Sequence, residues 1–184
     1  EWGPRAAREG EALPEKADVV VVGSGFTGAM AALHLARAGR DVVVLEAETI
    51  GFGASSRNGG QVGSGNQRFK VAQLKDMYGE EGARDLLAEG IAALAFIKSF
   101  VADEGIDCHL RHCGRFRGAS RPEHYESMAR DLEDLNALTG VESHMVSLAD
   151  QKSEIGTDLY HGGSVLPGDA SVHPALYHTG LVAK

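Results

Sequence analysis

The amino-acid sequence predicts an α/β fold that begins with a parallel βαβ unit and continues into a second, α+β part. Two continuous apolar runs, 18–22 and 41–45, have the composition of strands that are buried on both faces of a sheet. Between them, small and apolar side chains recur at helical spacing. Residues 67–172 then combine helical and extended segments, which we assign to the α+β part.

Each element of the βαβ unit has its own signal. The first strand is predicted over Asp18–Val22 and the second over Asp41–Leu45. Arg37 and Gly39 supply a basic last turn and a stop for the helix between them. One stripe of that helix is made of small residues that allow it to lie close to a sheet: Ala29, Ala32, Leu33 and Ala36.

A glycine-rich stretch, 51–65, follows the unit, and we interpret it as a functional loop. A long core helix is predicted over Glu80–Asp103 from the helical spacing of its apolar residues. An extended segment, broken at Gly114, is predicted over Asp107–Ala119.

The last third of the chain returns to helical patterns. Ser120 and Glu123 form a capping box for a helix that Gly140 closes. A short helix at 148–155 and an extended stretch at 159–166 come next. Pro174 then begins a helix that is expected to be still running at Lys184.

The composition argues against nucleic-acid and membrane partners. The chain has 18 Lys and Arg against 26 Asp and Glu, and its net charge of -8 would repel phosphate backbones and acidic lipids. Apolar runs such as Val19–Val22 are too short to span a bilayer. Residues 1–18 lack the apolar stretch of a secretion signal, and two Cys are too few for a disulfide scaffold. We therefore expect a cytoplasmic protein.

The turn after the first strand has the pattern GxGxxG, in Gly23-Ser24-Gly25-Phe26-Thr27-Gly28. Between a strand and a helix, Gly23 allows the tight turn, Gly25 lets the backbone approach a pyrophosphate, and Gly28 permits close helix packing. The anion then meets the N-terminal amides and about +0.5 of helix-dipole charge. Glycine-rich turns are also common as purely structural features, but this setting favours dinucleotide binding.

Glu46 ends the second strand, 18 residues after Gly28. At that place a carboxylate can accept both hydroxyls of an adenosine ribose, although by itself it would be an ordinary solvated acid. A ribose 2′-phosphate beside it would be repelled by roughly 4 kcal/mol at an effective dielectric of about 20. NADP is therefore disfavoured, while NAD and FAD stay open.

The next loop separates these two cofactors. Ile50–Gln61 offers small residues, hydroxyl groups and one cation, Arg57, that is able to meet a pyrophosphate. Over 17–61 the sequence resembles the opening of the amine and amino-acid oxidase family, which includes D-amino acid, glycine and sarcosine oxidases. Within that family it is most similar to the γ-glutamylputrescine oxidase group. A weaker similarity, over His173–Tyr177 and Gly180–Leu181, is to the family helix that leads back into the FAD domain.

The resemblance implies a Rossmann-type FAD-binding domain, here incomplete, with the start of an α+β substrate domain. It implies FAD as cofactor, an amine or amino acid as substrate, hydride removal from the carbon beside the substrate nitrogen, and oxygen as the usual acceptor. The implied cofactor-binding residues are Gly23, Ser24, Gly25, Phe26, Thr27 and Gly28 in the turn, Glu46 and Ala47 after the second strand, and Gly53, Ala54, Ser55, Ser56, Arg57, Asn58, Gly59, Gly60 and Gln61 in the flavin-side loop.

The implied domains follow the same comparison. They are an N-terminal extension (1–16), the βαβ unit with the flavin loop (17–66), helical segments with the start of the substrate domain (67–172), and a truncated returning helix (173–184). The loop 51–65 has no His or Cys, so we expect no covalent flavin attachment from this loop. Family members are much longer than this chain, and their substrate-binding part has no counterpart here, so catalytic residues are not assigned. Three alternatives stay open: another FAD-dependent dehydrogenase, an RNA-modifying oxidase module, and a non-catalytic nucleotide-binding fragment.

Cys108–Cys113 contains four possible metal ligands in six residues. In an extended segment, Cys108 and His112 face one side while His109 and Cys113 face the other, so the four cannot converge on one ion. We predict no metal there.

The two strands of the βαβ unit call for a third, which we expect to follow the helix that begins at Pro174. Without it, the first strand has an unpaired edge that favours self-association. We therefore expect this chain alone to hold FAD loosely and to leave the substrate unreacted.

Overall fold

The structure is a computed structural model that describes residues 12–65 and 68–184. Residues 1–11 of the predicted N-terminal extension and the predicted boundary residues 66 and 67 lie outside the described residues. The described residues form two compact units. The first holds the residues up to Gln61 together with Ser99–Leu110 and Val172–Lys184, and the second holds Val62–Lys98 and Arg111–Ser171. The domain boundaries inferred from the family stay predictions.

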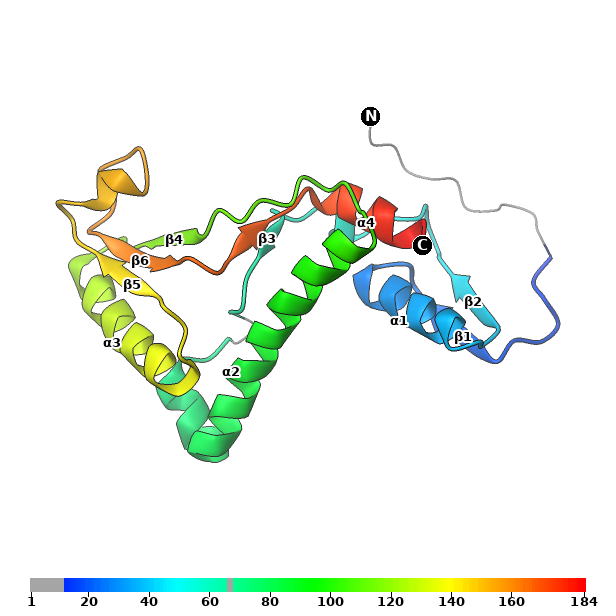
Figure 1. Cartoon of the computed structure of the whole chain (residues 1–184), viewed down its shortest axis with the longest axis horizontal. Coiled ribbons are helices and arrows are strands. Elements are labelled where there is room, and N and C mark those ends of the chain that lie inside the picture. The colour runs from blue at the N-terminus through cyan, green and yellow to red at the C-terminus, as the bar shows by residue number, and fades with distance from the viewer. Residues whose placement is uncertain (1–11, 66–67) are drawn as a thin grey trace. The chain divides into compact units, whose positions relative to one another are not determined.

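The first unit is built on β1 (Val19–Val22), α1 (Phe26–Arg37) and β2 (Val42–Leu45). The two strands are parallel, with Val19 opposite Val42 and Val22 opposite Leu45. Figure 1 shows α1 lying along this strand pair. The predicted βαβ unit is therefore confirmed.

The strand pair is covered more fully on one face than on the other. α1 buries Leu33 from its predicted stripe. By contrast, Val20 and Val22, which share the other face of the strand pair, are 54% and 85% exposed. The expectation of strands buried on both faces is thus wrong for the described residues, because alternate side chains point to opposite faces and only one face carries a helix.

α4 (Pro174–Val182) completes the first unit and packs against α1 and against the short 3₁₀ helix η1 (Ala54–Ser56). Its N-cap is His173, whose Nδ1 accepts a hydrogen bond from Leu176 N at 3.3 Å. The predicted start at Pro174 is confirmed. The prediction that the helix is still running at Lys184 is wrong, since α4 ends at Val182.

α2 (Val71–Asp103) belongs to the second unit as far as Lys98. The helix is interrupted at Gly79, where φ is 73°. The part after this kink confirms the predicted helix Glu80–Asp103. The helical segment before it, 71–78, was not predicted. The core of this region is apolar and includes Val71, Leu74, Ala83 and Leu87. No helix in the described part of the chain has both the length and the apolar character needed to cross a membrane.

The sheet of the second unit is antiparallel, in the order β4–β6–β5. Its strands are β4 (Arg115–Gly118), β5 (His144–Val146) and β6 (Gly163–Leu166). α3 (Pro122–Thr139) packs on β6 (Figure 1). The remaining elements are short: β3 (Gln61–Val62), which pairs with β7 (Ala170–Ser171), and the 3₁₀ helix η2 (Gln151–Ser153).

Local signals around α3 were only partly correct. Gly140 closes the helix with φ 70°, as predicted, but the capping box is wrong. Pro122 sets the first helical position, so the N-cap is Arg121, and Ser120 Oγ instead lies 2.9 Å from His124 Nδ1. The short helix predicted at 148–155 is reduced to the single turn η2.

Candidate functional site

The glycine turn joins β1 to α1 with little space for side chains. Gly23 has φ +96°, a conformation that favours glycine, and Gly25 is the extended N-cap of α1. A Cβ added at Gly28 would overlap the carbonyl oxygen of Gly23 and contact the Val21 side chain. Gly28 therefore allows α1 to begin directly against the end of its strand.

Glu46 lies at the end of β2 and is hydrogen-bonded to the glycine turn. Its Oε2 accepts the backbone N–H of Ser24 at 2.9 Å and the Ser24 hydroxyl at 2.5 Å. Its Oε1 accepts the N–H of Glu48 at 3.1 Å. The Ser24 hydroxyl, then the Ser24 and Glu48 N–H groups, lower the pKa of Glu46 from 4.5 to about 2, so the carboxylate is ionised at neutral pH.

Ser55, in η1, contacts the start of α1. Its hydroxyl oxygen accepts the backbone N–H of Phe26 at 3.0 Å. A Cβ added at Gly25 would lie 3.1 Å from the same hydroxyl oxygen. The loop after β2 thus reaches the helix N-terminus, where exposed N–H groups and the helix dipole favour an anion.

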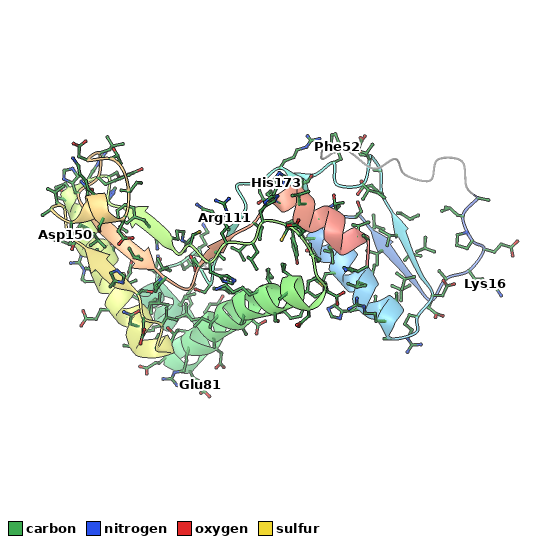
Figure 2. All side chains as sticks on the ribbon, turned by 45° about the horizontal axis from the view of Figure 1, so that its top comes forward. Lys16, Phe52, Glu81, Arg111, Asp150 and His173 are labelled. Carbon is green, nitrogen blue, oxygen red and sulfur yellow. The ribbon has the colours of Figure 1, made fainter. Side chains whose placement is uncertain are left out.

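The rest of the predicted flavin-side loop is shaped mainly by its own contacts. Asn58 Nδ2 donates to the carbonyls of Ala54 and Ser55 at 3.0 and 3.2 Å, and its Oδ1 accepts Gly60 N at 2.8 Å. The Arg57 guanidinium lies 4.4 Å from the centre of the Phe52 ring, which Figure 2 labels on this loop.

The structure therefore brings together only part of the predicted set. Ser24, Phe26, Glu46 and Ser55 are joined by hydrogen bonds. Ser56 donates to the Gly51 carbonyl, and Gly60 O accepts Val172 N. No hydrogen bond, ion pair or ring contact connects Arg57 to the glycine turn in the part of the chain that the structure describes. The other members of the set are exposed: Thr27, Ala47, Gly53, Ala54, Gly59 and Gln61.

His178 of α4 also belongs to this region, although it was not predicted from the sequence. The side chain is buried, and its Nε2 lies 2.6 Å from the carbonyl oxygen of Ser24. Because the carbonyl only accepts, Nε2 carries the proton. One signal could have found it: His178 and Leu181 share one face of an apolar helix, and a buried His requires a polar partner.

A groove of about 700 Å³ opens beside Glu46 within the first unit. Ser24 and Glu46 contribute polar groups to it, and the other walls are largely apolar side chains from α1, β2 and α4, among them Ala32, Val43 and Leu181. The groove offers an apolar surface next to an ionised carboxylate, a combination that suits a flat aromatic base attached to a sugar.

The segment 108–113 differs from the regular strand on which the metal argument relied. His109 has φ 54°, which breaks the alternation of faces, and only Arg111 forms a strand-like bridge, to Ser171. Cys108 is buried, which raises the pKa of its thiol, and Cys113 is exposed. Within residues 12–65 and 68–184 no three His, Cys, Asp or Glu side chains are grouped to hold a metal. The absence of a metal stays a prediction, which elemental analysis can test.

Comparison with known proteins identifies similar chains. Residues 18–184 match the profile of the DAO family, described as FAD dependent oxidoreductase. A "Probable oxidoreductase OrdL" of Rhizobium meliloti is 34% identical over 174 residues, which cover 92% of this chain and 39% of the relative. The gamma-glutamylputrescine oxidoreductase of Escherichia coli is 34% identical over 157 residues, which cover 85% of this chain and 36% of that relative.

Solved structures extend the comparison to the fold. Glycine oxidase from Geobacillus kaustophilus superposes with a TM-score of 0.76 at 21% identity, covering 90% of this chain and 43% of that one. L-amino acid deaminase from Proteus vulgaris superposes with a TM-score of 0.71 at 24% identity, covering 98% of this chain and 40% of that one. These solved structures confirm the predicted α/β class. The family profile and the two relatives above confirm the resemblance noted in the sequence. The chain spans about two fifths of the length of these proteins.

Proposed function

The chain belongs to the FAD-dependent oxidoreductase family, and from that premise we propose that the whole protein oxidises the C–N bond of an amine or amino acid. The observation that carries the proposal is the convergence of three segments. The glycine turn, the carboxylate of Glu46 and the η1 loop are linked by the Ser24–Glu46 and Phe26–Ser55 hydrogen bonds. The names of two relatives, a gamma-glutamylputrescine oxidoreductase and a glycine oxidase, support an amine or amino-acid substrate.

The residues of the first unit fit the adenosine diphosphate part of FAD. Glu46 is ionised and borders the groove, so its carboxylate would accept the ribose hydroxyls. A carboxylate has about four acceptor positions, and Ser24 and Glu48 occupy three of them here. We therefore propose that the Ser24 hydroxyl turns away when a ribose hydroxyl binds. The same charge disfavours the 2′-phosphate of NADP.

The N-terminus of α1 would hold the diphosphate. Gly23, Gly25 and Gly28 keep side chains out of the turn, and Ser55 contributes a hydroxyl beside the Phe26 N–H. We propose that the loop 53–61 lies on the flavin side, with Asn58 maintaining its shape and Arg57 leaving Phe52 to meet phosphate oxygens. These residues bind and orient the cofactor, and none of them is assigned a proton-transfer role.

When bound, FAD would supply the electron acceptor for removal of a hydride from the carbon beside the substrate nitrogen. We propose oxygen as the final acceptor of these electrons. An ionised Glu46 and an apolar groove keep the adenosine end in place while that chemistry occurs elsewhere in the whole protein. We propose a cytoplasmic location, as the composition suggested. The unpaired edge of β1 supports the further proposal that the isolated chain self-associates.

An absorption experiment tests the proposal. The purified whole protein is incubated with FAD, freed of unbound cofactor and compared with its Glu46→Arg variant and with a matched control, Glu48→Arg. We expect flavin bands that are weakened in the Glu46 variant alone. Equal retention in all three proteins would remove Glu46 from the site, and no retention in any of them would favour a chain without an FAD site.

The whole protein is then mixed anaerobically with gamma-glutamylputrescine, glycine and simple amines. Bleaching of the flavin bands, followed by recovery on admission of air, supports an amine or amino-acid oxidase. Bleaching without rapid recovery in air supports a dehydrogenase with another acceptor. Bound flavin that no amine reduces would contradict the proposed substrate class.

A further inference from the structure

His178 is buried in α4 and is joined by a hydrogen bond to a residue 154 positions away. Only 2% of its surface is exposed, and its Nε2 donates to the Ser24 carbonyl at 2.6 Å. The ring also lies 5.9 Å from the ring of Phe26, at the start of α1. A Cβ added at Gly51 would lie 3.1 Å from His178 Nδ1. The imidazole therefore contacts the glycine turn, α1 and the loop after β2.

The helix that carries His178 has little freedom to move. Tyr177 and Leu181 are buried beside it, and Tyr177 packs on Phe26 with ring centres 5.1 Å apart. Gly180 lies so close to Ile106 that an added Cβ would overlap the Ile106 side chain. Close packing of this kind holds a side chain in one position.

The hydrogen bond from His178 fixes the direction of a peptide group. The described chain contains no cis peptide, so the Ser24 carbonyl and the Gly25 N–H point in opposite directions. Holding the carbonyl toward His178 directs the Gly25 N–H away from α4. No acceptor for that N–H is found among residues 12–65 and 68–184, and Gly25 is the residue at which the backbone approaches a pyrophosphate in this motif.

We propose that His178 is a positioning residue, which orients the Ser24–Gly25 peptide so that the Gly25 N–H is presented to the diphosphate of the cofactor. This inference rests on the proposed FAD site. Glu46 accepts the backbone N–H of Ser24 while His178 donates to its carbonyl, so the backbone of the residue before Gly25 is held at both polar groups. His178 acts through that peptide and does not itself contact FAD.

Two amide variants of the full chain separate this role from general packing. In His178→Gln, the side-chain amide nitrogen reaches the place of the imidazole Nε2 and donates to the same carbonyl. His178→Asn carries the same group on a side chain one methylene shorter, which leaves the carbonyl without a donor. Both lose the imidazole ring, so the difference between them reports the hydrogen bond.

Binding is measured by calorimetry with FAD, with ADP and with adenosine, which lacks the diphosphate. We expect His178→Asn to raise the Kd for FAD and ADP about 10-fold, which equals about 1.4 kcal/mol, and His178→Gln to stay within about 3-fold of wild type. Adenosine binding should be equal in all three chains. Equal ADP binding in both variants and wild type, or an adenosine loss as large as the ADP loss, would overturn the inference.

A measurement on the unaltered chain covers the case in which a variant fails to fold. The nitrogen chemical shifts of the His178 ring report which nitrogen carries the proton. We expect a protonated Nε2 with and without ADP, and an Nε2 without a proton would overturn the inference. If wild type binds neither FAD nor ADP, the proposed site and this inference both fail. If it binds them and His178→Asn binds equally well, only this inference fails.

Discussion

Replacing Glu46 with glutamine tests the link between the glycine turn and the end of β2. Three hydrogen bonds favour the ionised carboxylate and lower its pKa from 4.5 to about 2. A pKa change of one pH unit corresponds to about 1.4 kcal/mol, so the whole shift, taken without solvent screening, would stabilise the fold by roughly 3 kcal/mol. The carboxylate is only partly buried, so solvent screening reduces the expected loss in Glu46→Gln to about 1 kcal/mol at neutral pH.

The pH dependence of that loss has a definite sign. A carboxylate whose pKa is lower in the folded state stabilises the fold above its unfolded pKa, and this stabilisation is lost as the pH falls through the folded value. The difference between wild type and Glu46→Gln should therefore be constant above 4.5 and decline between 4.5 and about 2.

Urea unfolding followed by circular dichroism measures this difference. Glu48→Gln is the matched control, because the Glu48 side chain makes no hydrogen bond to the described residues and only its backbone N–H contacts Glu46. We expect the control to unfold like wild type. A Glu46→Gln chain as stable as the control at neutral pH, or a stability difference that is unchanged at about pH 3, would refute the reasoning.

Three further variants test individual contacts. Ser24→Ala removes the largest cause of the shifted carboxylate, so an NMR titration should find the pKa of Glu46 raised from about 2 toward 4.5, and an unchanged value would contradict that assignment. Gly28→Ala places a Cβ against the carbonyl oxygen of Gly23, so urea unfolding should show a loss of about 2–4 kcal/mol in stability. Gly53→Ala is the matched control: its Cβ would enter open space, and stability should change by less than about 0.5 kcal/mol. Asp169→Asn in the second unit should cost about 2–4 kcal/mol, because the Asp169 carboxylate is 3% exposed and lies 2.9 Å from Arg115 Nε; a wild-type unfolding midpoint would show that this ion pair contributes little.

Several parts of the fold and site could be predicted because their causes are local. The apolar runs before Gly23 and Glu46 predict parallel strands, and the structure has β1 and β2 there. Gly140 ends α3 and Pro174 begins α4, because each of these residue types favours by itself the backbone conformation of that helix end. The place of GxGxxG between a strand and a helix likewise predicted a tight turn.

Other predictions failed where neighbouring signals compete. Ser120 and Glu123 have capping-box spacing, but Pro122 between them sets the first helical position and moves the cap to Arg121. The alternation assumed for 108–113 fails at His109, whose left-handed conformation no residue type in that segment announced.

The sequence by itself determined the order of strand, glycine turn, helix and acidic strand end, since each depends on residues adjacent in the chain. Only the tertiary structure decided which distant groups meet. It joins Ser24 to Glu46 across 22 positions, Phe26 to Ser55 across 29, and Ser24 to His178 across 154. Such contacts depend on how α1, η1 and α4 pack, and packing is a property of many residues together that no short pattern contains.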